Sequence, residues 1–182
     1  MGFELEEYQT SLRSVVTLTG TGVHSGKPAT VRFLPADADT GIVFQATAPD
    51  GLSMELRAWH SSVGSTDLST VLGDPAGAHV ATVEHLMAAL FGLGIDNAVI
   101  ESEGGEVPIL DGSAAPFVDA FEQAGIEELP VRRRYLRVIK PVRVDSGSSW
   151  AEFRPYNGTR FEVEIDFESP AIGRQVFAGD LS

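Results

Sequence analysis

Short stretches in which apolar and polar residues alternate recur along the first two thirds of the chain. They are rich in β-branched and aromatic side chains, and glycine-rich or polar turns separate them, as is typical of β-strands. The predicted strands are residues 14–18, 29–34, 41–44 and 96–101. A glycine-rich connection at residues 20–27 joins the first two, and we expect it to form a hairpin-like turn with His24 at its tip.

A different periodicity, with apolar residues three and four positions apart, begins after residue 82 and predicts an α-helix. Its apolar stripe consists of Val83, Leu86, Met87 and Leu90. Thr82 is expected to cap the N-terminus of this helix, and Gly92 or Gly94 to end it.

Glu84 and His85 lie off this stripe, about 100° apart around the helix axis, on a side that otherwise carries small residues. In the first turn the helix dipole favours the carboxylate and a neutral imidazole that can bind metal. The pair could therefore serve as a general base beside a metal ligand. The alternative is a Glu-His pair on a solvated or domain-facing surface, hydrogen-bonded locally.

A second helix is predicted from Pro116, because proline is tolerated at the first helical position. Phe117 and Phe121 face one way along it, and Gly125 ends it. The apolar residues 107–110 before this helix are expected to form a strand that ends in an Asp-Gly turn. Asp111 either anchors that turn or lines a site, and we favour the structural role.

From residue 135 onward alternating strands return without a helical segment. They are predicted at residues 135–144, 150–156 and 160–167. A charged stretch at residues 127–134 marks a boundary, so we expect a first α+β domain at residues 1–129 and the opening strands of a second at residues 130–182. Residues 150–157 weakly echo residues 29–36, which predicts two similar sheet-plus-helices domains, the second of them incomplete.

Composition narrows the possible functions. The chain has 182 residues, a net charge of −13 and no cysteine, so disulfides and thiolate metal sites are excluded and a metal would need His, Asp or Glu. The acidic balance argues against general nucleic-acid binding. Gly26-Lys27 lacks the other residues of a phosphate-binding loop. The acidic N-terminus is unlike a leader peptide, and we expect a cytoplasmic protein without a membrane span.

Several motifs, in a fixed order over nearly the whole chain, resemble the UDP-3-O-acyl-N-acetylglucosamine deacetylases, the zinc amidases of lipid A biosynthesis in Gram-negative bacteria. The resemblance rests on linked segments. They are Gly20-Thr21-Gly22-Val23-His24-Ser25-Gly26, Thr82-Val83-Glu84-His85-Leu86, Gly92-Leu93-Gly94-Ile95-Asp96-Asn97, Ile109-Leu110-Asp111-Gly112-Ser113 and Trp150-Ala151-Glu152-Phe153.

The resemblance implies a two-domain α+β hydrolase with its active site in the cleft between similar domains. By this analogy His85 is a Zn2+ ligand, and Glu84 is the general base that activates water. Leu68 and Ser69 line the approach of the UDP-acyl-sugar substrate. Phe167, with Asp166 beside it, stacks on the uracil ring. His24 either contacts substrate or holds its turn, and we slightly favour the turn.

Residues 1–182 depart from the family pattern in one respect. The family's other two zinc ligands, a histidine and an aspartate four residues apart, are expected downstream of Ser182, since a catalytic zinc needs three protein ligands. We therefore predict that the isolated chain is inactive, and that it self-associates or pairs with a separate C-terminal half. The alternative is a non-catalytic truncated paralogue that binds a nucleotide-sugar or a protein partner.

Overall fold

The computed structural model describes residues 7–48 and 50–181, which divide into two compact units. The first unit is Glu6–Arg133 and the second is Arg134–Ser182. Both consist mainly of strands, and the only two α-helices of the described residues belong to the first unit. The expected α+β class is confirmed at this level. The expected domain boundary at residue 129 falls inside a strand of the first unit, and the division into two similar domains stays a prediction.

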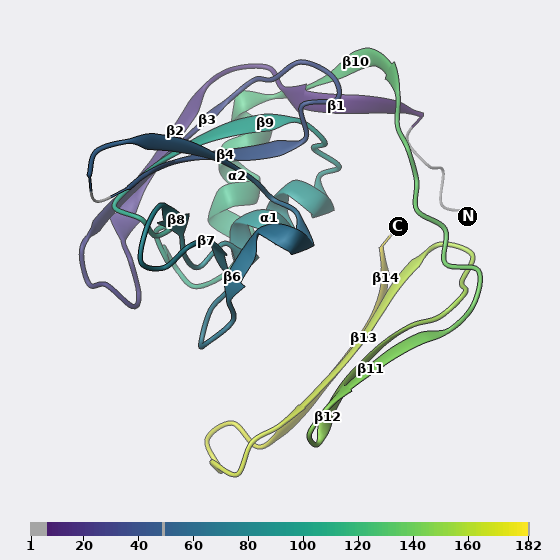
Figure 1. The fold of residues 1–182 in the computed structure, drawn as a ribbon. Coiled ribbons are helices and arrows are strands. Elements are labelled where there is room, and N and C mark those ends of the chain that lie inside the picture. Colours follow the sequence, from purple (N-terminus) through teal and green to yellow (C-terminus); the bar gives the residue numbers. More distant parts are fainter. Residues whose placement is uncertain (1–6, 49, 182) are drawn as a thin grey trace. The chain divides into compact units, whose positions relative to one another are not determined.

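A five-stranded mixed sheet forms the first layer of the first unit (Figure 1). Neighbouring strands are antiparallel except for the parallel pair β4–β9. In spatial order the strands are β2 (Val16–Thr21), β3 (Pro28–Leu34), β9 (Ala98–Glu103), β4 (Ile42–Thr47) and β5 (Ser53–Arg57). The predicted strands at residues 14–18, 29–34, 41–44 and 96–101 are confirmed, with bounds shifted by a few residues.

Two helices, α1 (Glu84–Gly92) and α2 (Ala115–Ala124), lie against one face of this sheet (Figure 1). The core between the layers contains fully buried side chains from each of them. From the sheet come Phe33, Phe44 and Ile100, from α1 Leu86 and Leu90, and from α2 Phe117 and Phe121. The apolar stripe predicted for the first helix is confirmed, because Val83, Leu86 and Leu90 are buried and Met87 packs against the core. Gly125 follows α2 with a φ of 76°, as expected of a helix-ending glycine.

Two smaller sheets complete the first unit. β1 (Tyr8–Leu12) pairs antiparallel with β10 (Ile126–Arg132), and β6 (Val63–Ser65), β7 (Val71–Gly73) and β8 (His79–Val80) form a three-stranded sheet preceded by a 3-10 turn, His60–Ser62. The charged segment at residues 127–134 contains the division between the two units, at Arg133 and Arg134, and most of it forms strand β10. Its acidic and basic side chains flank a backbone ladder with β1, which a charge pattern alone does not reveal.

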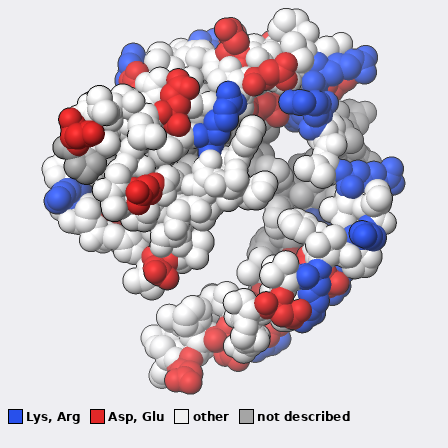
Figure 2. Space-filling view, viewed as in Figure 1, with Lys and Arg blue, Asp and Glu red and all other residues white. Residues whose placement is uncertain are grey.

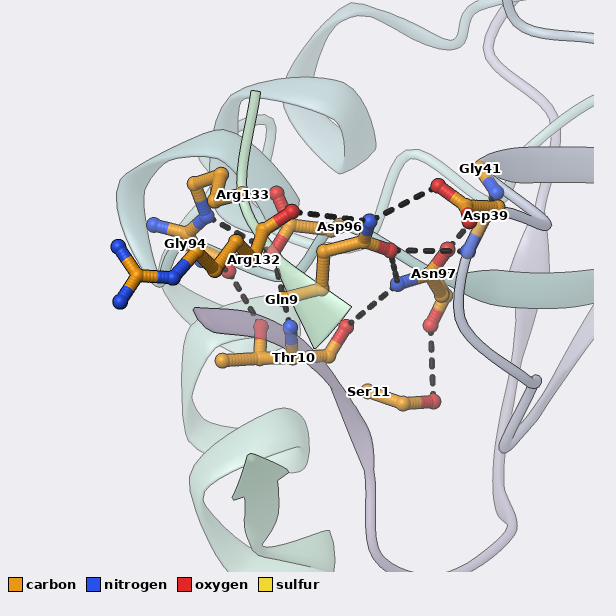
Figure 3. Close-up of polar contacts among 10 residues, drawn as sticks. All are labelled: Gln9, Thr10, Ser11, Asp39, Gly41, Gly94, Asp96, Asn97, Arg132 and Arg133. Atoms are coloured by element: carbon orange, nitrogen blue, oxygen red, sulfur yellow. Dashed lines mark hydrogen bonds and ion pairs between the residues drawn. The ribbon is translucent and has the colours of Figure 1, made fainter. Parts of the chain in front are cut away.

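A polar network joins β1 to the segments that precede β4 and β9 and to the end of β10 (Figure 3). Asn97 is buried, and its side chain donates to the Thr10 carbonyl (3.2 Å) and accepts from the Gly41 N–H (2.9 Å). The neighbouring Asp96 accepts hydrogen bonds from the Thr10 N–H (2.8 Å) and from the Arg133 guanidinium (2.7 Å). Because buried polar groups are costly unless hydrogen-bonded, this network fixes where β1 and the end of β10 lie in the first unit.

The second unit consists of two antiparallel hairpins. β11 (Val142–Ser146) pairs with β12 (Ser149–Phe153), and β13 (Thr159–Asp166) pairs with β14 (Arg174–Leu181). Two predicted strands are confirmed here, but residues 135–141 are not part of a strand, contrary to expectation. No described residue of this unit is buried.

Charged side chains of both signs are interspersed on the face shown in Figure 2. Several form exposed ion pairs, such as Arg32 with Glu101 at 2.7 Å. No α-helix in the described part of the chain is long and apolar enough to cross a membrane.

Candidate functional site

Five of the seven site residues predicted from the sequence line one open hollow of about 620 Å³ in the first unit. They come from three separate segments of the chain. His24 lies in the β2–β3 turn, Leu68 and Ser69 in the loop before β7, and Glu84 and His85 in the first turn of α1. Residues of the segment before α2, including Ile109 and Ser113, form the remaining wall.

The Glu84 side chain is exposed to the hollow, and its carboxylate accepts a hydrogen bond from the Thr70 N–H. Thr70 directly follows Leu68 and Ser69, so this contact connects the first turn of α1 to the loop that carries both residues. A carboxylate in the first turn also faces the positive end of the helix dipole.

His85 is half-buried, and its ring packs edge-on against Phe117 of α2, with ring centroids 6.1 Å apart and an interplanar angle of 73°. Phe117 itself is fully buried. Because an immobile aromatic ring supports the imidazole on one side, the orientation of His85 toward the hollow is restricted. This is a suitable arrangement for a metal ligand, which must be held in one direction.

The expected N-cap role of Thr82 was wrong. α1 begins at Glu84 with Val83 at the N-cap, and Thr82 adopts a left-handed conformation with a φ of 61°. Its hydroxyl does not cap the helix but donates to the Glu106 carboxylate at 3.2 Å. Glu106 is buried and lies 24 residues further along the chain, so a rule based on neighbouring residues cannot predict that Thr82 bonds to it.

Glu106 supports the wall of the hollow, and the sequence analysis did not single it out. Only 3% of it is exposed, and its carboxylate accepts the backbone N–H groups of His24 and Ser25, each at 2.9 Å. The β2–β3 turn is therefore held by Glu106 through its backbone, and the His24 side chain is left to line the hollow. The available signal was an acidic residue between the glycine pair 104–105 and the apolar residues 107–110.

Burial raises the pKa of Glu106, but the hydrogen bonds from His24, Ser25 and Thr82 outweigh it, so that the pKa lies below its ordinary value. The side chain is thus a carboxylate at neutral pH. Its donors are neutral N–H and hydroxyl groups, so no positive charge among them neutralises the carboxylate.

Backbone strain is concentrated around the same hollow. Leu68, Thr82 and Leu110 have φ values of 61°, 61° and 52°, in a region that non-glycine residues rarely adopt. Leu68 and Thr82 line the hollow, and Leu110 lies between two lining residues, Ile109 and Gly112. Such strain persists only where the surrounding structure enforces it, and it is often found at functional sites.

Residues 107–110 do not form the strand expected from their apolar character. Val107 donates to the Ala81 carbonyl (3.0 Å) and Ile109 to the Thr21 carbonyl (3.0 Å), so the segment bonds to two different neighbours in place of one ladder. Asp111 then accepts from the Ser113 N–H (2.8 Å) and hydroxyl (2.9 Å). These bonds lower the pKa of Asp111, and they fit the structural role favoured for it.

The other two predicted residues, Asp166 and Phe167, lie in the second unit. Asp166 ends β13 opposite Arg174, and the Phe167 N–H donates to the Gly173 carbonyl at 3.1 Å. The Phe167 side chain is half exposed and available for stacking. Their roles stay predictions.

Within residues 7–48 and 50–181, no three His, Asp or Glu side chains are grouped so that they could hold a metal ion. The hollow is lined by two imidazoles, from His85 and His24, and by the carboxylate of Glu84. This set fits part of a zinc site, since a catalytic zinc has three protein ligands and one open position. A zinc ion held here would need further ligands.

Comparison with known proteins gives a consistent match. Residues 9–182 match the model of the LpxC family, described as UDP-3-O-acyl N-acetylglycosamine deacetylase. Proteins called UDP-3-O-acyl-N-acetylglucosamine deacetylase from Brucella ovis and Brucella canis are each 55% identical to the chain over 177 residues, and the one from Brucella melitensis biotype 2 is 54% identical. Each match covers 97% of this chain and 61% of the relative, so the chain spans about three fifths of the length of these relatives.

Proposed function

The chain belongs to the UDP-3-O-acyl N-acetylglycosamine deacetylase family, and on this premise we propose that it supplies the general base and one metal ligand of a zinc-dependent deacetylase. The substrate would be UDP-3-O-acyl-N-acetylglucosamine, and the reaction a cytoplasmic step of lipid A biosynthesis. The observation that carries the proposal is the hollow, in which residues from three segments, named beforehand from the sequence, line one space. Two similar domains, the second represented here by its opening strands, are part of the same proposal.

In this mechanism Glu84 removes a proton from the attacking water, and its contact with the Thr70 N–H keeps the carboxylate aimed into the hollow. His85 would hold the metal through a ring nitrogen, with its ring supported by Phe117. The chemistry that zinc supplies when bound is Lewis-acid activation of water and of the acetamide carbonyl.

Substrate contacts are assigned to the rest of the hollow. Leu68 is 92% exposed, so it can offer an apolar surface to the substrate beside Ser69. His24 lines the same space from the β2–β3 turn. In the second unit, Phe167 would stack on the uracil ring with Asp166 beside it.

The decisive experiment measures release of acetate from UDP-3-O-acyl-N-acetylglucosamine. The reading frame beyond codon 182 is determined, and the encoded protein is assayed beside residues 1–182 alone. We expect turnover only when the downstream ligands are included. In that protein Glu84→Gln should lower kcat by roughly 10²- to 10⁴-fold, the usual contribution of a general base. Glu122→Gln is the matched control, because Glu122 is an exposed carboxylate on α2 outside the hollow.

Zinc retention provides an independent measurement. Residues 1–182 should lose zinc on dialysis, because His85 is their one convincing ligand, and stoichiometric zinc after dialysis would contradict this. If a stop codon follows codon 182 and the chain binds the UDP-sugar without hydrolysing it, the non-catalytic alternative replaces the proposal.

A further inference from the structure

Glu106 lies between two segments that contribute to the hollow. Its own backbone runs beside the segment that enters α1, since the Ala81 N–H donates to the Gly105 carbonyl (2.9 Å) and the Val107 N–H to the Ala81 carbonyl (3.0 Å). Its side chain reaches the β2–β3 turn. One residue therefore contacts the two segments that carry His24 and the Glu84-His85 pair.

The Glu106 carboxylate bridges these segments with both oxygens. Oε1 accepts from the His24 N–H (2.9 Å) and from the Thr82 hydroxyl (3.2 Å), while Oε2 accepts from the Ser25 N–H (2.9 Å). A buried charge is tolerated only when its hydrogen-bonding capacity is used. Removing the carboxylate would leave donors of two segments without their acceptor at the same time.

Thr82 gives this bridge a mechanical role. A β-branched residue with a φ of 61° is held in an unfavourable conformation, and it lies two residues before Glu84. The bond from its hydroxyl to Glu106 is one of the contacts that hold it there. If the contact is lost, Thr82 can relax, and the first turn of α1 moves with it.

Gly22 shows how closely the turn fits around the carboxylate. A Cβ atom at this position would lie 2.1 Å from Oε2 of Glu106 and 2.5 Å from the Ser25 hydroxyl oxygen. The backbone of Gly22 is not left-handed, so glycine is needed there for space and not for its φ angle. Gly22→Ala is therefore a second way to displace the Glu106 carboxylate without changing Glu106 itself.

We propose that Glu106 is a positioning residue that sets the distance between the His24 turn and the first turn of α1, and so the shape of the hollow. It touches neither Glu84 nor His85 and acts through Thr82 and through the backbone of residues 24–25. Its importance for catalysis rests on the proposed function, whereas the coupling of the two segments does not.

The coupling is tested by NMR on residues 1–182, comparing wild type with Glu106→Gln, Gly22→Ala and the control Glu103→Gln. Glu103 is an exposed carboxylate at the end of β9, three residues away and outside the hollow. In Glu106→Gln one acceptor oxygen becomes an NH2 group that faces backbone N–H donors. We expect the amide protons of His24 and Ser25 to exchange with solvent roughly ten to a hundred times faster in both site variants. Amide resonances of the first turn of α1 should shift as well.

A purely structural role would act on only one segment. If α1 resonances stay in place while the turn opens, or if Glu103→Gln gives the same changes, the proposal is overturned. Should Glu106→Gln fail to fold, Gly22→Ala decides, because it keeps the carboxylate. In the deacetylase assay, activity per folded molecule should fall at least tenfold in both site variants. Without wild-type turnover the proposed function fails, while the NMR result still decides the coupling.

Discussion

The first unit buries four phenylalanines completely, whereas every aromatic side chain of the second unit is exposed. Both units are built from strands with alternating side chains, and both contain several aromatic residues. The difference is the second layer. α1 and α2 cover the mixed sheet of the first unit, while the two hairpins of the second unit have no helix among their described residues. Alternation thus determines that a strand forms, but burial depends on what packs on it.

One ion pair of the first unit is more enclosed than the ion pairs of the second. In the first unit the side chains of Arg133 and Asp96 are only 13% and 26% exposed. In the second unit the ion pairs lie on the surface, such as Arg143–Asp145 and Arg174–Glu164. The residues packed around Arg133 and Asp96 hold this ion pair in one geometry. Exposed ion pairs contribute little to the free energy of unfolding.

The largest expected effect is loss of a core aromatic. Phe33 is fully buried, with its ring centroid 4.9 Å from that of Phe121 and 6.5 Å from that of Phe117. Phe33→Ala should lower the free energy of unfolding by about 3–5 kcal/mol, whereas Phe153→Ala in β12 should change it by less than about 0.5 kcal/mol. Urea unfolding of both variants measures this. Equal losses would show that the second unit has a core of its own.

Breaking the half-buried ion pair should come next. Asp96→Asn removes the charge that Arg133 faces and weakens the acceptor of the Thr10 N–H, so we expect a loss of about 1–3 kcal/mol. The matched change Asp145→Asn affects an exposed pair and should cost no more than about 0.5 kcal/mol. The same urea experiment applies. A loss for Asp145→Asn as large as that for Asp96→Asn would contradict the comparison.

Much of the fold was readable from the sequence, because strands and helices follow local periodicity. The stripe of α1 and the strands β2, β3, β4 and β9 illustrate this. The pairing of β10 with β1 was not readable, since its charged residues resemble a linker until the partner strand is known. Residues 107–110 look like a strand but divide their hydrogen bonds between Ala81 and Thr21, a decision made by tertiary contacts.

The candidate site shows the same limit. The family resemblance predicted five residues that line the hollow in the first unit. It did not predict the hydrogen bonds that hold their segments in place. Glu106 carries no local signature, because its donors at residues 24–25 and at Thr82 lie far away in the sequence. The left-handed backbone of Thr82 likewise contradicts its propensity. Residues that support a site are therefore found by structure more readily than by pattern.

Acid should distinguish the two units through their carboxylates. Because the pKa of Glu106 is lower in the folded state than its ordinary value of about 4.5, the unfolded chain binds the proton more readily. The stability that this carboxylate contributes is present above that pH and is lost as the pH falls through the lower, folded-state pKa. Glu106→Gln should flatten the dependence of the unfolding free energy on pH below about 4.5. Urea unfolding at a series of acidic pH values measures this.

Salt sharpens the same measurement. A hydrogen bond from Arg174 lowers the pKa of Glu164 in the second unit, and this pair is exposed. At 1 M salt the screening length is about 3 Å, so the pKa of Glu164 should return toward its ordinary value. Glu106 is buried among neutral donors and should keep its lowered pKa. NMR titration of the carboxyl carbons with and without salt tests this, and equal responses would contradict it.

The smallest expected effect concerns Leu68, a residue of the first unit whose side chain is as exposed as those of the second unit. Leu68 is 92% exposed and has a φ of 61°, so glycine there should relieve strain and offset its own entropic cost. Leu68→Gly is expected to change the unfolding free energy by less than about 1 kcal/mol, in the stabilising direction. Leu136→Gly, at an exposed position without a left-handed backbone, should be slightly destabilising through backbone entropy. A clear loss of stability for Leu68→Gly would mean that this side chain packs in solution, and that the loop beside Glu84 belongs to the core and not to the wall of an open site.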